Sequence, residues 1–417
     1  MARIGLRLSA REPADAERTT ASLSSVLRSP ARDRVSFNGH EVPKYVREFW
    51  TSKQRQASSI NEISYRACFK PQLPRFFIQW LTQANDIVYD PFSGRGTTVI
   101  EAGLLARRIV SNDANPLSAL LARPRFSPPN PDKLEERLSQ LPFNNDLRPG
   151  IELSMFFHPK TLEEIVGIRN YLAERRYAGQ EDHIDQWIRM VASNRLTGHS
   201  AGFFSVYTLP PNQAVSPESQ IKINDRLHQQ PEYRDTSKII LKKTRSLLRN
   251  LTASQSRNLR RAGNTGIFLT KDASHTDEIA SEIVQLTVTS PPFLDIVQYS
   301  KDNWLRCWFN GLDVDKISKQ ITMSKTLEDW RMKMRDVFQE LFRVTRSGGW
   351  VAFEVGEVRN GTINLDEHVV PLGLEAGFEC AGILINQQTF TKTANIWGIK
   401  NNSSGTNTNR IALFYKA

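Results

Sequence analysis

The chain has 417 residues, which is enough for a large buried core and for two or three structural units, or for one domain with a long insertion. Lysine and arginine (55) exceed aspartate and glutamate (44) by 11, and the sequence pI near 9.6 favours a polyanionic partner. The three cysteines, Cys68, Cys307 and Cys380, lie far apart without C-x-x-C spacing, which argues against a disulfide framework and against a metal site of the zinc type.

The first residues contain no apolar signal core, and no apolar stretch of the sequence approaches the length of a membrane span. Residues 1–40 are rich in Arg, Ser and Ala, but Glu12, Asp15 and Glu17 argue against a transit peptide. We expect residues 1–40 to be a flexible basic arm. The whole chain is expected to be cytoplasmic, associated with the nucleoid if prokaryotic, with no membrane partner.

An α/β pattern begins after the arm. A helix is expected over Arg75–Leu81 with Pro74 in its first turn, followed by a short buried strand at Ile87–Tyr89. A second helix is expected over Val99–Ala106 and a second strand over Arg108–Val110. Strand, glycine-rich turn, helix and strand in this order predict the beginning of a Rossmann-like, doubly wound α/β sheet.

The turn after the first strand reads Asp90-Pro91-Phe92-Ser93-Gly94-Arg95-Gly96-Thr97-Thr98. Gly94 and Gly96 let the backbone approach a ligand closely, and the N–H groups of the following helix suit an anionic group such as a carboxylate. Asp113, after the second strand, is placed to accept hydrogen bonds from two ribose hydroxyls. A P-loop is excluded because no lysine precedes Thr97, so a nucleoside cofactor is favoured over an ordinary tight turn.

Residues 126–265 interrupt this alternation and are expected to form a largely helical insertion. Thr161 and Glu164 match a capping box, and apolar residues at helical spacing predict a second helix around residues 184–191. Residues 236–271 contain no acidic side chain. Either this stretch is a solvated face or the insertion binds nucleic acid through basic side chains, and the candidates are Arg195, Lys242, Lys243, Arg245, Arg249, Arg257, Arg260 and Arg261.

The sheet resumes at Ile267–Leu269, after which Asp272 is placed either to accept from an adenine amino group or to cap the next turn. The apolar run 283–288 predicts a buried strand, which the prolines of Thr289-Ser290-Pro291-Pro292-Phe293 must end. Ser290 and a proline carbonyl suit an amino group, and Phe293 suits the face of a flat ring. The alternative is a simple strand stop with Phe293 in the core.

The last part of the chain completes the α/β pattern. Helices are expected at residues 303–309 and 330–344, the second closed by Ser347-Gly348-Gly349, and a strand follows at Trp350–Val355. Two further strands at residues 381–386 and 410–415 predict a C-terminal β-hairpin. Residues 41–125 and 266–417 would together form the α/β domain.

These two motifs resemble those of S-adenosylmethionine-dependent amino methyltransferases of DNA. The stretch Asp90 to Gly96 is similar to their cofactor motif, Ser290 to Phe293 is similar to their catalytic motif, and Phe69-Lys70-Pro71 resembles the segment that precedes the cofactor motif. The resemblance covers roughly residues 60–125 and 265–417. It implies a methyltransferase sheet, S-adenosylmethionine as cofactor and double-stranded DNA as partner, with a cognate restriction endonuclease as a candidate second partner.

The resemblance also assigns roles to residues. Serine at the first position of the tetrapeptide is typical of cytosine-N4 methylation, whereas Asp or Asn is typical of adenine-N6 methylation. No Pro-Cys dipeptide is present, which disfavours cytosine-C5 chemistry. The alternatives that stay open are adenine-N6 methylation, RNA base methylation and a non-catalytic nucleic-acid-binding protein. The expected catalytic residues are Ser290, Pro291, Pro292 and Phe293, and the expected cofactor-binding residues are Phe69, Lys70, Pro71, Asp90, Pro91, Phe92, Ser93, Gly94, Gly96, Thr97, Thr98, Asp113 and Asp272.

Overall fold

The computed structural model describes most of the chain, in ten segments. These are residues 33–37, 39–50, 57–66, 68–143, 148–209, 213–292, 302–320, 326–358, 363–387 and 408–417. The strands are β1 (Asp33–Phe37), β2 (His40–Arg47), β3 (Ile87–Asp90), β4 (Arg108–Asn112), β5 (Ile267–Leu269), β6 (Val284–Thr289), β7 (Thr345–Val355), β8 (Glu357–Val358), β9 (Ile363–Asn364), β10 (Glu379–Gln387) and β11 (Thr408–Lys416). The helices are η2 (Ser59–Asn61), α2 (Gln72–Leu81), α3 (Thr97–Leu104), α4 (Leu117–Ala122), η3 (Arg123–Phe126), α5 (Pro131–Ser139), α6 (Pro159–Tyr177), α7 (His183–Arg195), α8 (Pro217–Leu227), α9 (Thr236–Leu248), α10 (Ala253–Thr265), α12 (Trp304–Asn310), α13 (Val314–Gln320), α14 (Leu327–Val344) and α15 (Asp366–Glu375).

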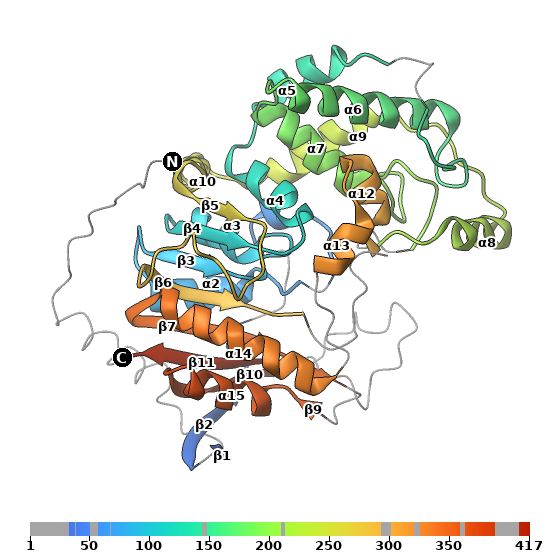
Figure 1. The fold of residues 1–417 in the computed structure, drawn as a ribbon. Helices are drawn as coiled ribbons and strands as arrows, with labels where there is room; N and C mark the ends of the chain where they lie inside the picture. The colour runs from blue at the N-terminus through green and yellow to red at the C-terminus, as the bar shows by residue number, and fades with distance from the viewer. Residues whose placement is uncertain are drawn as a thin grey trace.

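One large sheet organises the molecule (Figure 1). Within the described residues it has nine strands in the order β1-β2-β10-β11-β7-β6-β3-β4-β5. The five strands from β7 to β5 are mutually parallel, and β11 is antiparallel to both β7 and β10. The strand order reverses between β3 and β6, as it does at the switch point of a doubly wound sheet. The predicted Rossmann-like sheet and its C-terminal hairpin are therefore confirmed.

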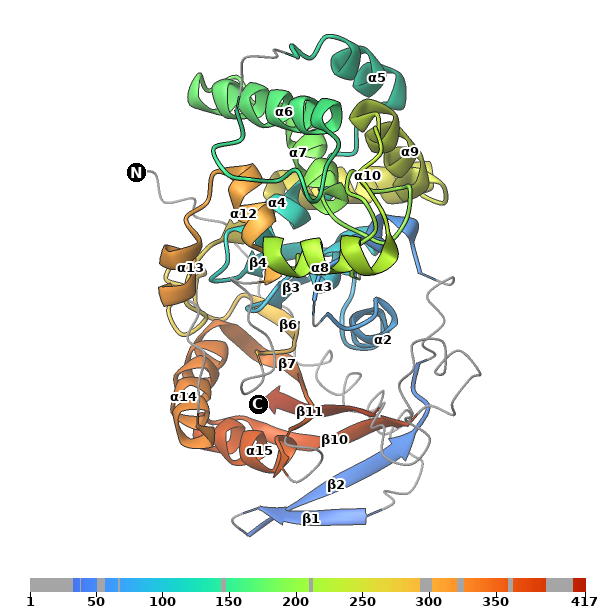
Figure 2. The ribbon, with the colours of Figure 1, turned by 90° about the vertical axis from the view of Figure 1, so that its right-hand side faces the viewer.

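Helices cover both faces of this sheet, because successive strand residues point to opposite faces. Val88 packs with the core that includes α2 and α3, whereas Tyr89 packs with the core that includes α14 and α15. Trp350 and Val351 divide between the same two cores. Figure 2 shows α14 and α15 on one side of the strands and α2 on the other.

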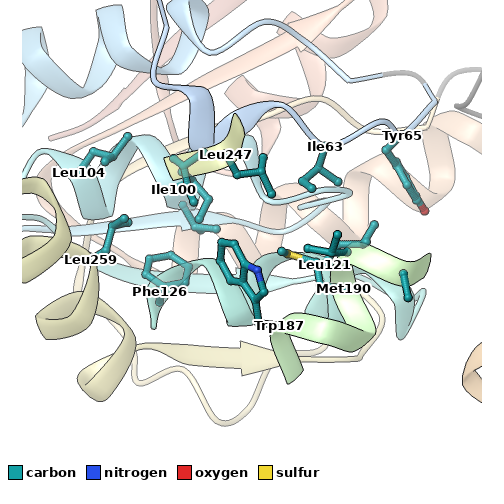
Figure 3. Close-up of a cluster of buried hydrophobic side chains, with 14 of the residues drawn as sticks. Ile63, Tyr65, Ile100, Leu104, Leu121, Phe126, Trp187, Met190, Leu247 and Leu259 are labelled. Atoms are coloured by element: carbon teal, nitrogen blue, oxygen red, sulfur yellow. The ribbon is translucent and has the colours of Figure 1, made fainter. Parts of the chain in front are cut away.

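The predicted helical insertion is confirmed, since residues 126–265 contain α5 to α10 and no strand among their described residues before β5. Its core is continuous with that of the sheet. Trp187 and Met190 of α7 and Leu247 of α9 belong to the same buried cluster as Ile100 of α3 and Phe126 of η3 (Figure 3). The insertion is therefore held on the helices that follow β3 and β4 by hydrophobic burial.

Three expected boundaries are wrong. Helix α6 begins at Pro159, and the side chain of His158 accepts from the Lys160 N–H, so Thr161 is not its N-cap. Residues 347–349, expected to close the helix before a strand that begins at Trp350, already belong to β7, which begins at Thr345. Residues 33–37 of the expected arm form β1 and His40 begins β2, while residues 1–32 and residue 38 lie outside the described residues.

In the part of the chain that the structure describes, no helix combines the length and the apolar character needed to cross a membrane.

Candidate functional site

The two motifs lie at one edge of the sheet. Because β3, β4, β5, β6 and β7 are parallel, their carboxyl ends share an edge, called here the carboxyl edge. Asp90 ends β3, Thr289 ends the neighbouring β6, and Asp113 follows β4. Ligands of doubly wound sheets bind beyond this edge, at the point where the strand order reverses.

The glycine-rich turn after β3 adopts a conformation that requires its glycines. Gly94 and Gly96 have φ angles of 51° and 79°, in the left-handed region that side chains disfavour. A Cβ atom on Gly96 would lie 2.6 Å from the Cβ of Ala122, because α4 packs directly on the turn. The Ser93 N–H donates to the Asn112 carbonyl (2.9 Å), which ties the turn to the end of β4.

Asp113 holds the same turn from the side of β4. Its Oδ2 accepts from the Gly94 N–H (2.7 Å) and its Oδ1 accepts from the Asn115 N–H (2.8 Å). Burial raises its pKa to about 6, although both hydrogen bonds lower it. Each carboxylate oxygen keeps a second lone pair, so the predicted acceptance from ribose hydroxyls remains compatible with these contacts.

The other residues of the cofactor motif are largely internal. The Thr98 hydroxyl donates to the Val288 carbonyl (3.0 Å) and thereby joins α3 to β6. Asn112 Nδ2 donates to the Pro91 carbonyl (3.2 Å), and Thr97 Oγ1 accepts from Arg95 Nε (3.1 Å). Phe92 packs against the core formed with α14. These residues shape the turn. The N–H groups of Phe92, Ser93, Gly94 and Gly96 also have acceptors within the protein.

The segment that precedes α2 is fastened to this turn by two arginines. Arg95 donates from Nη1 to the Ile63 carbonyl (2.7 Å) and from Nη2 to the Phe69 carbonyl (3.4 Å). Arg125, which is fully buried, donates in turn to the carbonyl of Arg95. The structure thus brings Phe69, Lys70 and Pro71 beside the glycine-rich turn, as the resemblance implies. Sequence reasoning missed Arg125, because nothing local marks an arginine as buried.

Asp272 lies at the same edge, after β5. It caps the next turn, which is the second of the two roles expected from the sequence. Its Oδ1 accepts from the Ser274 N–H (2.9 Å) and hydroxyl (2.8 Å). Its Oδ2 accepts from Lys333 Nζ of α14 (2.5 Å). Burial raises the pKa of Asp272, but the hydrogen bonds from Lys333 and Ser274 outweigh it, and the pKa lies below its usual value. The group is therefore an ionised acceptor.

The Ser290 motif, residues 289–293, is connected to three other strands or helices. Thr289 Oγ1 donates to Asp90 Oδ1 (2.6 Å), and the Trp330 indole N–H of α14 donates to the Pro292 carbonyl (3.0 Å). The Ser290 side chain hydrogen-bonds to the carboxylate of Glu354 on β7. Phe293 lies outside the described residues. The turn is thus fixed before Ser290, at Ser290 and at Pro292.

Glu354 is a polar residue of the site that sequence reasoning missed. It lies beside Ser290 because Thr289 pairs with Phe353 in the parallel register of β6 and β7. Asn409 Nδ2 of β11 donates to its Oε1 (2.7 Å). Burial raises the pKa of Glu354, and the hydrogen bonds from Ser290 and Asn409 only partly offset this. The signal was a single acid within the apolar strand Trp350–Val355.

The predicted nucleic-acid residues of the insertion differ in exposure. Arg195 is buried, with its guanidinium 4.0 Å from the centre of the Phe203 ring, so its charge is not displayed on the surface. Arg245 pairs with Glu135 (3.3 Å) and Arg249 pairs with Glu62. Burial lowers the pKa of the half-buried Lys243 to about 8, whereas Lys242 is exposed.

The arginines of α10 lie away from the carboxyl edge. Asn258 Nδ2 donates to the carbonyl of Leu104, the last residue of α3 (3.2 Å). Helix α3 starts at the glycine-rich turn and runs back across the sheet, so its end lies near the opposite edge (Figure 1). The exposed Arg257, Arg260 and Arg261 therefore lie on the side of the sheet remote from the two motifs.

Comparisons with known proteins support the resemblance over part of the chain. Residues 18–121 match the N6_N4_Mtase model of DNA methylases. A type II methyltransferase, M.MvaI from Kocuria varians, is 32% identical over 83 residues, which are 19% of this chain. The chain thus matches 18% of the length of this curated relative. The matched family segment contains the glycine-rich turn and Asp113 but not the Ser290 motif.

Solved structures give a weaker likeness. Two structures of the rRNA methyltransferase aviRa from Streptomyces viridochromogenes align with TM-scores of 0.34 and 0.30, each at 10% identity. The alignments cover 88% and 73% of this chain and 92% and 82% of those chains. TM-scores this low do not define a shared fold, so the fold assignment rests on the strand order.

Proposed function

We propose that this chain is an S-adenosylmethionine-dependent methyltransferase that modifies the exocyclic N4 amine of cytosine in a specific DNA sequence. The observation that carries the proposal is the contact between the two motifs. Thr289, which precedes Ser290, donates to Asp90, which opens the glycine-rich turn. The turns proposed to hold the cofactor and the amine follow adjacent parallel strands, β3 and β6. The match of residues 18–121 to DNA methylases supports DNA as the substrate class.

The residues of the glycine-rich turn fit a nucleoside cofactor with an amino-acid part. Gly94 and Gly96 allow the left-handed conformation of the turn, and the missing Cβ of Gly96 lets α4 pack against it. Asp113 and Asp272 offer acceptors at successive strand ends. S-adenosylmethionine supplies an electrophilic methyl group on a sulfonium when bound. The residues proposed to hold it are those of the three segments around this turn together with the two acids: Phe69 to Pro71, Asp90 to Ser93, Gly94, Gly96, Thr97, Thr98, Asp113 and Asp272.

The catalytic turn would orient the acceptor amine. An exocyclic amine is a poor nucleophile because its lone pair is delocalised into the ring. Hydrogen bonds from the amine to Ser290 Oγ and to the Pro291 carbonyl would favour a more tetrahedral nitrogen with its lone pair directed at the methyl carbon. The target base would reach this turn by flipping out of the duplex, at a cost of a few kcal/mol.

Glu354 is the proposed acceptor of the proton that the amine loses. As the N–CH3 bond forms and the S–CH3 bond breaks, the amine nitrogen becomes positively charged and must lose one proton. Serine is too weak a base to keep that proton, but the Ser290 hydroxyl is hydrogen-bonded to Glu354. The carboxylate of Glu354 would accept a proton through Ser290, and its raised pKa suits that role.

Thiolate chemistry at the ring carbon has no support among the cysteines. Burial raises the pKa of Cys68, raises that of Cys307 to about 11 and raises that of Cys380 to about 12. Each thiol is therefore neutral at physiological pH and a weak nucleophile. Direct transfer to an amine is favoured over attack by cysteine on cytosine C5.

A labelling experiment identifies the base that the protein methylates. The protein is incubated with methyl-labelled S-adenosylmethionine and separate DNA and RNA pools, and the nucleosides are then separated. We expect label in N4-methyldeoxycytidine, and Ser290→Ala should greatly slow its appearance while cofactor binding persists. Label in N6-methyladenine or in RNA alone would replace cytosine N4 by the corresponding alternative. No label in any pool, despite cofactor binding, would favour a non-catalytic protein. A restriction endonuclease partner would be sought by testing whether the modified DNA resists cleavage in an extract of the source cells.

A further inference from the structure

The connection between β5 and β6 is unusual for a doubly wound sheet. Such connections commonly contain a helix, but residues 270–283 form turns here and no helix. Helix α14, which follows much later in the chain, lies along this connection. Glu340 Oε1 accepts from the Thr276 N–H (3.0 Å), and Arg343 Nη1 donates to the Ile279 carbonyl (3.0 Å).

The first turns of α14 reach the proposed active site with two side chains. Lys333 Nζ donates to Asp272 Oδ2 (2.5 Å) and to Ser274 Oγ (3.1 Å). Trp330 Nε1 donates to the carbonyl of Pro292 in the catalytic turn (3.0 Å). Residues three apart on a helix are neighbours on its surface, so Trp330 and Lys333 make their two contacts from the same face of α14.

The two contacts involve groups on both sides of the methyl-transfer site. Asp272 is the proposed acceptor for the adenine end of the cofactor, and Pro292 belongs to the turn that would hold the base. Trp330 is only 2% exposed, and Met334, Val337 and Phe338 bury the same helix against the sheet. A packed helix moves as one body, so a shift of the connection at Asp272 is transmitted to Pro292.

We propose that α14 is a brace that sets Asp272 and the catalytic turn in one arrangement, which makes Lys333 and Trp330 positioning residues for methyl transfer. This inference rests on the proposed function. It predicts that cofactor binding at Asp272 favours the arrangement in which the catalytic turn can hold the amine. Neither residue needs to touch the reacting atoms.

The test uses the full chain and the variants Trp330→Phe, Lys333→Met and Lys333→Arg. Arg331→Gln is the matched control, because Arg331 lies in the same turn but pairs with Glu328 within α14 (3.4 Å). Calorimetry measures the Kd of S-adenosylmethionine, and single-turnover assays on cognate DNA measure the methyl-transfer rate at saturating cofactor. Circular dichroism verifies that each variant is folded.

The decisive readout is the effect of each change on the other end of the brace. Trp330→Phe is expected to slow transfer about tenfold and also to weaken cofactor binding a few-fold. Lys333→Met is expected to raise the cofactor Kd about tenfold and to slow transfer a few-fold even at saturation. Lys333→Arg should restore most of both values, and Arg331→Gln should resemble the wild type.

Two results would overturn the inference. If Trp330→Phe changes only the transfer rate and Lys333→Met only the cofactor Kd, the contacts are independent and α14 is no brace. If Arg331→Gln causes the same losses, the effect belongs to helix stability in general. If Trp330→Phe does not fold, the Lys333 variants decide alone. A wild-type protein that neither binds the cofactor nor transfers methyl would instead refute the proposed function.

Discussion

Thr289 and Asp90 form a direct link between the two motifs of the chain. The Thr289 hydroxyl lies 2.6 Å from Oδ1 of Asp90, and both side chains are buried at the carboxyl ends of adjacent strands. The two residues are 199 positions apart in the sequence. The contact therefore ties the glycine-rich turn to the turn that carries Ser290.

Removing this link should damage both stability and cofactor binding. Thr289→Val keeps the shape of the side chain but removes one of the donors to the buried Asp90 carboxyl, so the free energy of unfolding should fall by about 1–3 kcal/mol. Thr289→Ser keeps the hydroxyl and should cost less. Urea unfolding and calorimetry with S-adenosylmethionine measure the two effects. If Thr289→Val loses no more stability than Thr289→Ser, the hydrogen bond contributes no more than the methyl group.

Asp90 should make the protein less stable as the pH rises. Burial raises its pKa from 3.8 to about 7, although the hydrogen bond from Thr289 lowers it. Between these values the native carboxyl holds a proton that the unfolded chain has lost. Its stabilising contribution is therefore complete near pH 4 and is lost as the pH rises through about 7.

The matched variant is Asp90→Asn, which is neutral at every pH. The stability of this variant relative to the wild type should increase between pH 5 and pH 8, by on the order of 2–3 kcal/mol. Chemical unfolding at a series of pH values measures the difference. A difference that stays constant with pH would mean that the native carboxyl of Asp90 is ionised throughout.

Glu354→Gln should slow methyl transfer without loss of cofactor affinity. The amide retains the shape of the side chain and its contact with Asn409, but it cannot take a proton from Ser290. Because burial raises the pKa of Glu354, the wild-type rate should increase with pH as this carboxyl ionises, and the variant should lose that limb of the profile. Single-turnover rates against pH provide the measurement.

A double variant shows whether Ser290 and Glu354 act together in methyl transfer or contribute independently. If the two side chains act as one unit, Ser290→Ala with Glu354→Gln should be little slower than the worse single variant. Multiplicative losses in the double variant would argue that Glu354 only supports the sheet.

The sequence could predict the two motifs because local chemistry determines where a chain leaves a strand. Prolines after Thr289 and glycines after Asp90 force turns wherever the strands happen to lie. The positions of Glu354, Trp330 and Arg125 at the site could not be predicted, because these depend on strand register and helix packing across long separations. The burial of Arg195 was missed for the same reason, because the sequence does not show that the Phe203 ring packs over its guanidinium.

Gly96→Ala should separate crowding from backbone strain in the glycine-rich turn. The added Cβ would meet Ala122 at 2.6 Å, and the φ of 79° is itself unfavourable for alanine. Gly150 is the matched control, since its φ is 75° but nothing lies within 4 Å of an added Cβ. We expect Gly150→Ala to cost about 1 kcal/mol of unfolding free energy and Gly96→Ala about 2–4 kcal/mol. Equal costs in thermal or urea unfolding would show that α4 yields to the new methyl group.

The arginines of α10 test how far the DNA extends over the protein. Arg257, Arg260 and Arg261 lie near the edge of the sheet opposite the motifs, so a duplex that just spans the recognition sequence should not reach them. Replacing all three by glutamine should leave the transfer rate and KM for such a short duplex within about twofold. Each phosphate contact contributes about 0.9 to the slope of log K against log salt, so a smaller slope with long DNA would reveal contacts to flanking phosphates. A large loss of affinity for the short duplex would instead mean that the target DNA crosses α10. That result would contradict a DNA site confined to the carboxyl edge, because the contact between Asn258 and Leu104 places α10 at the far end of α3.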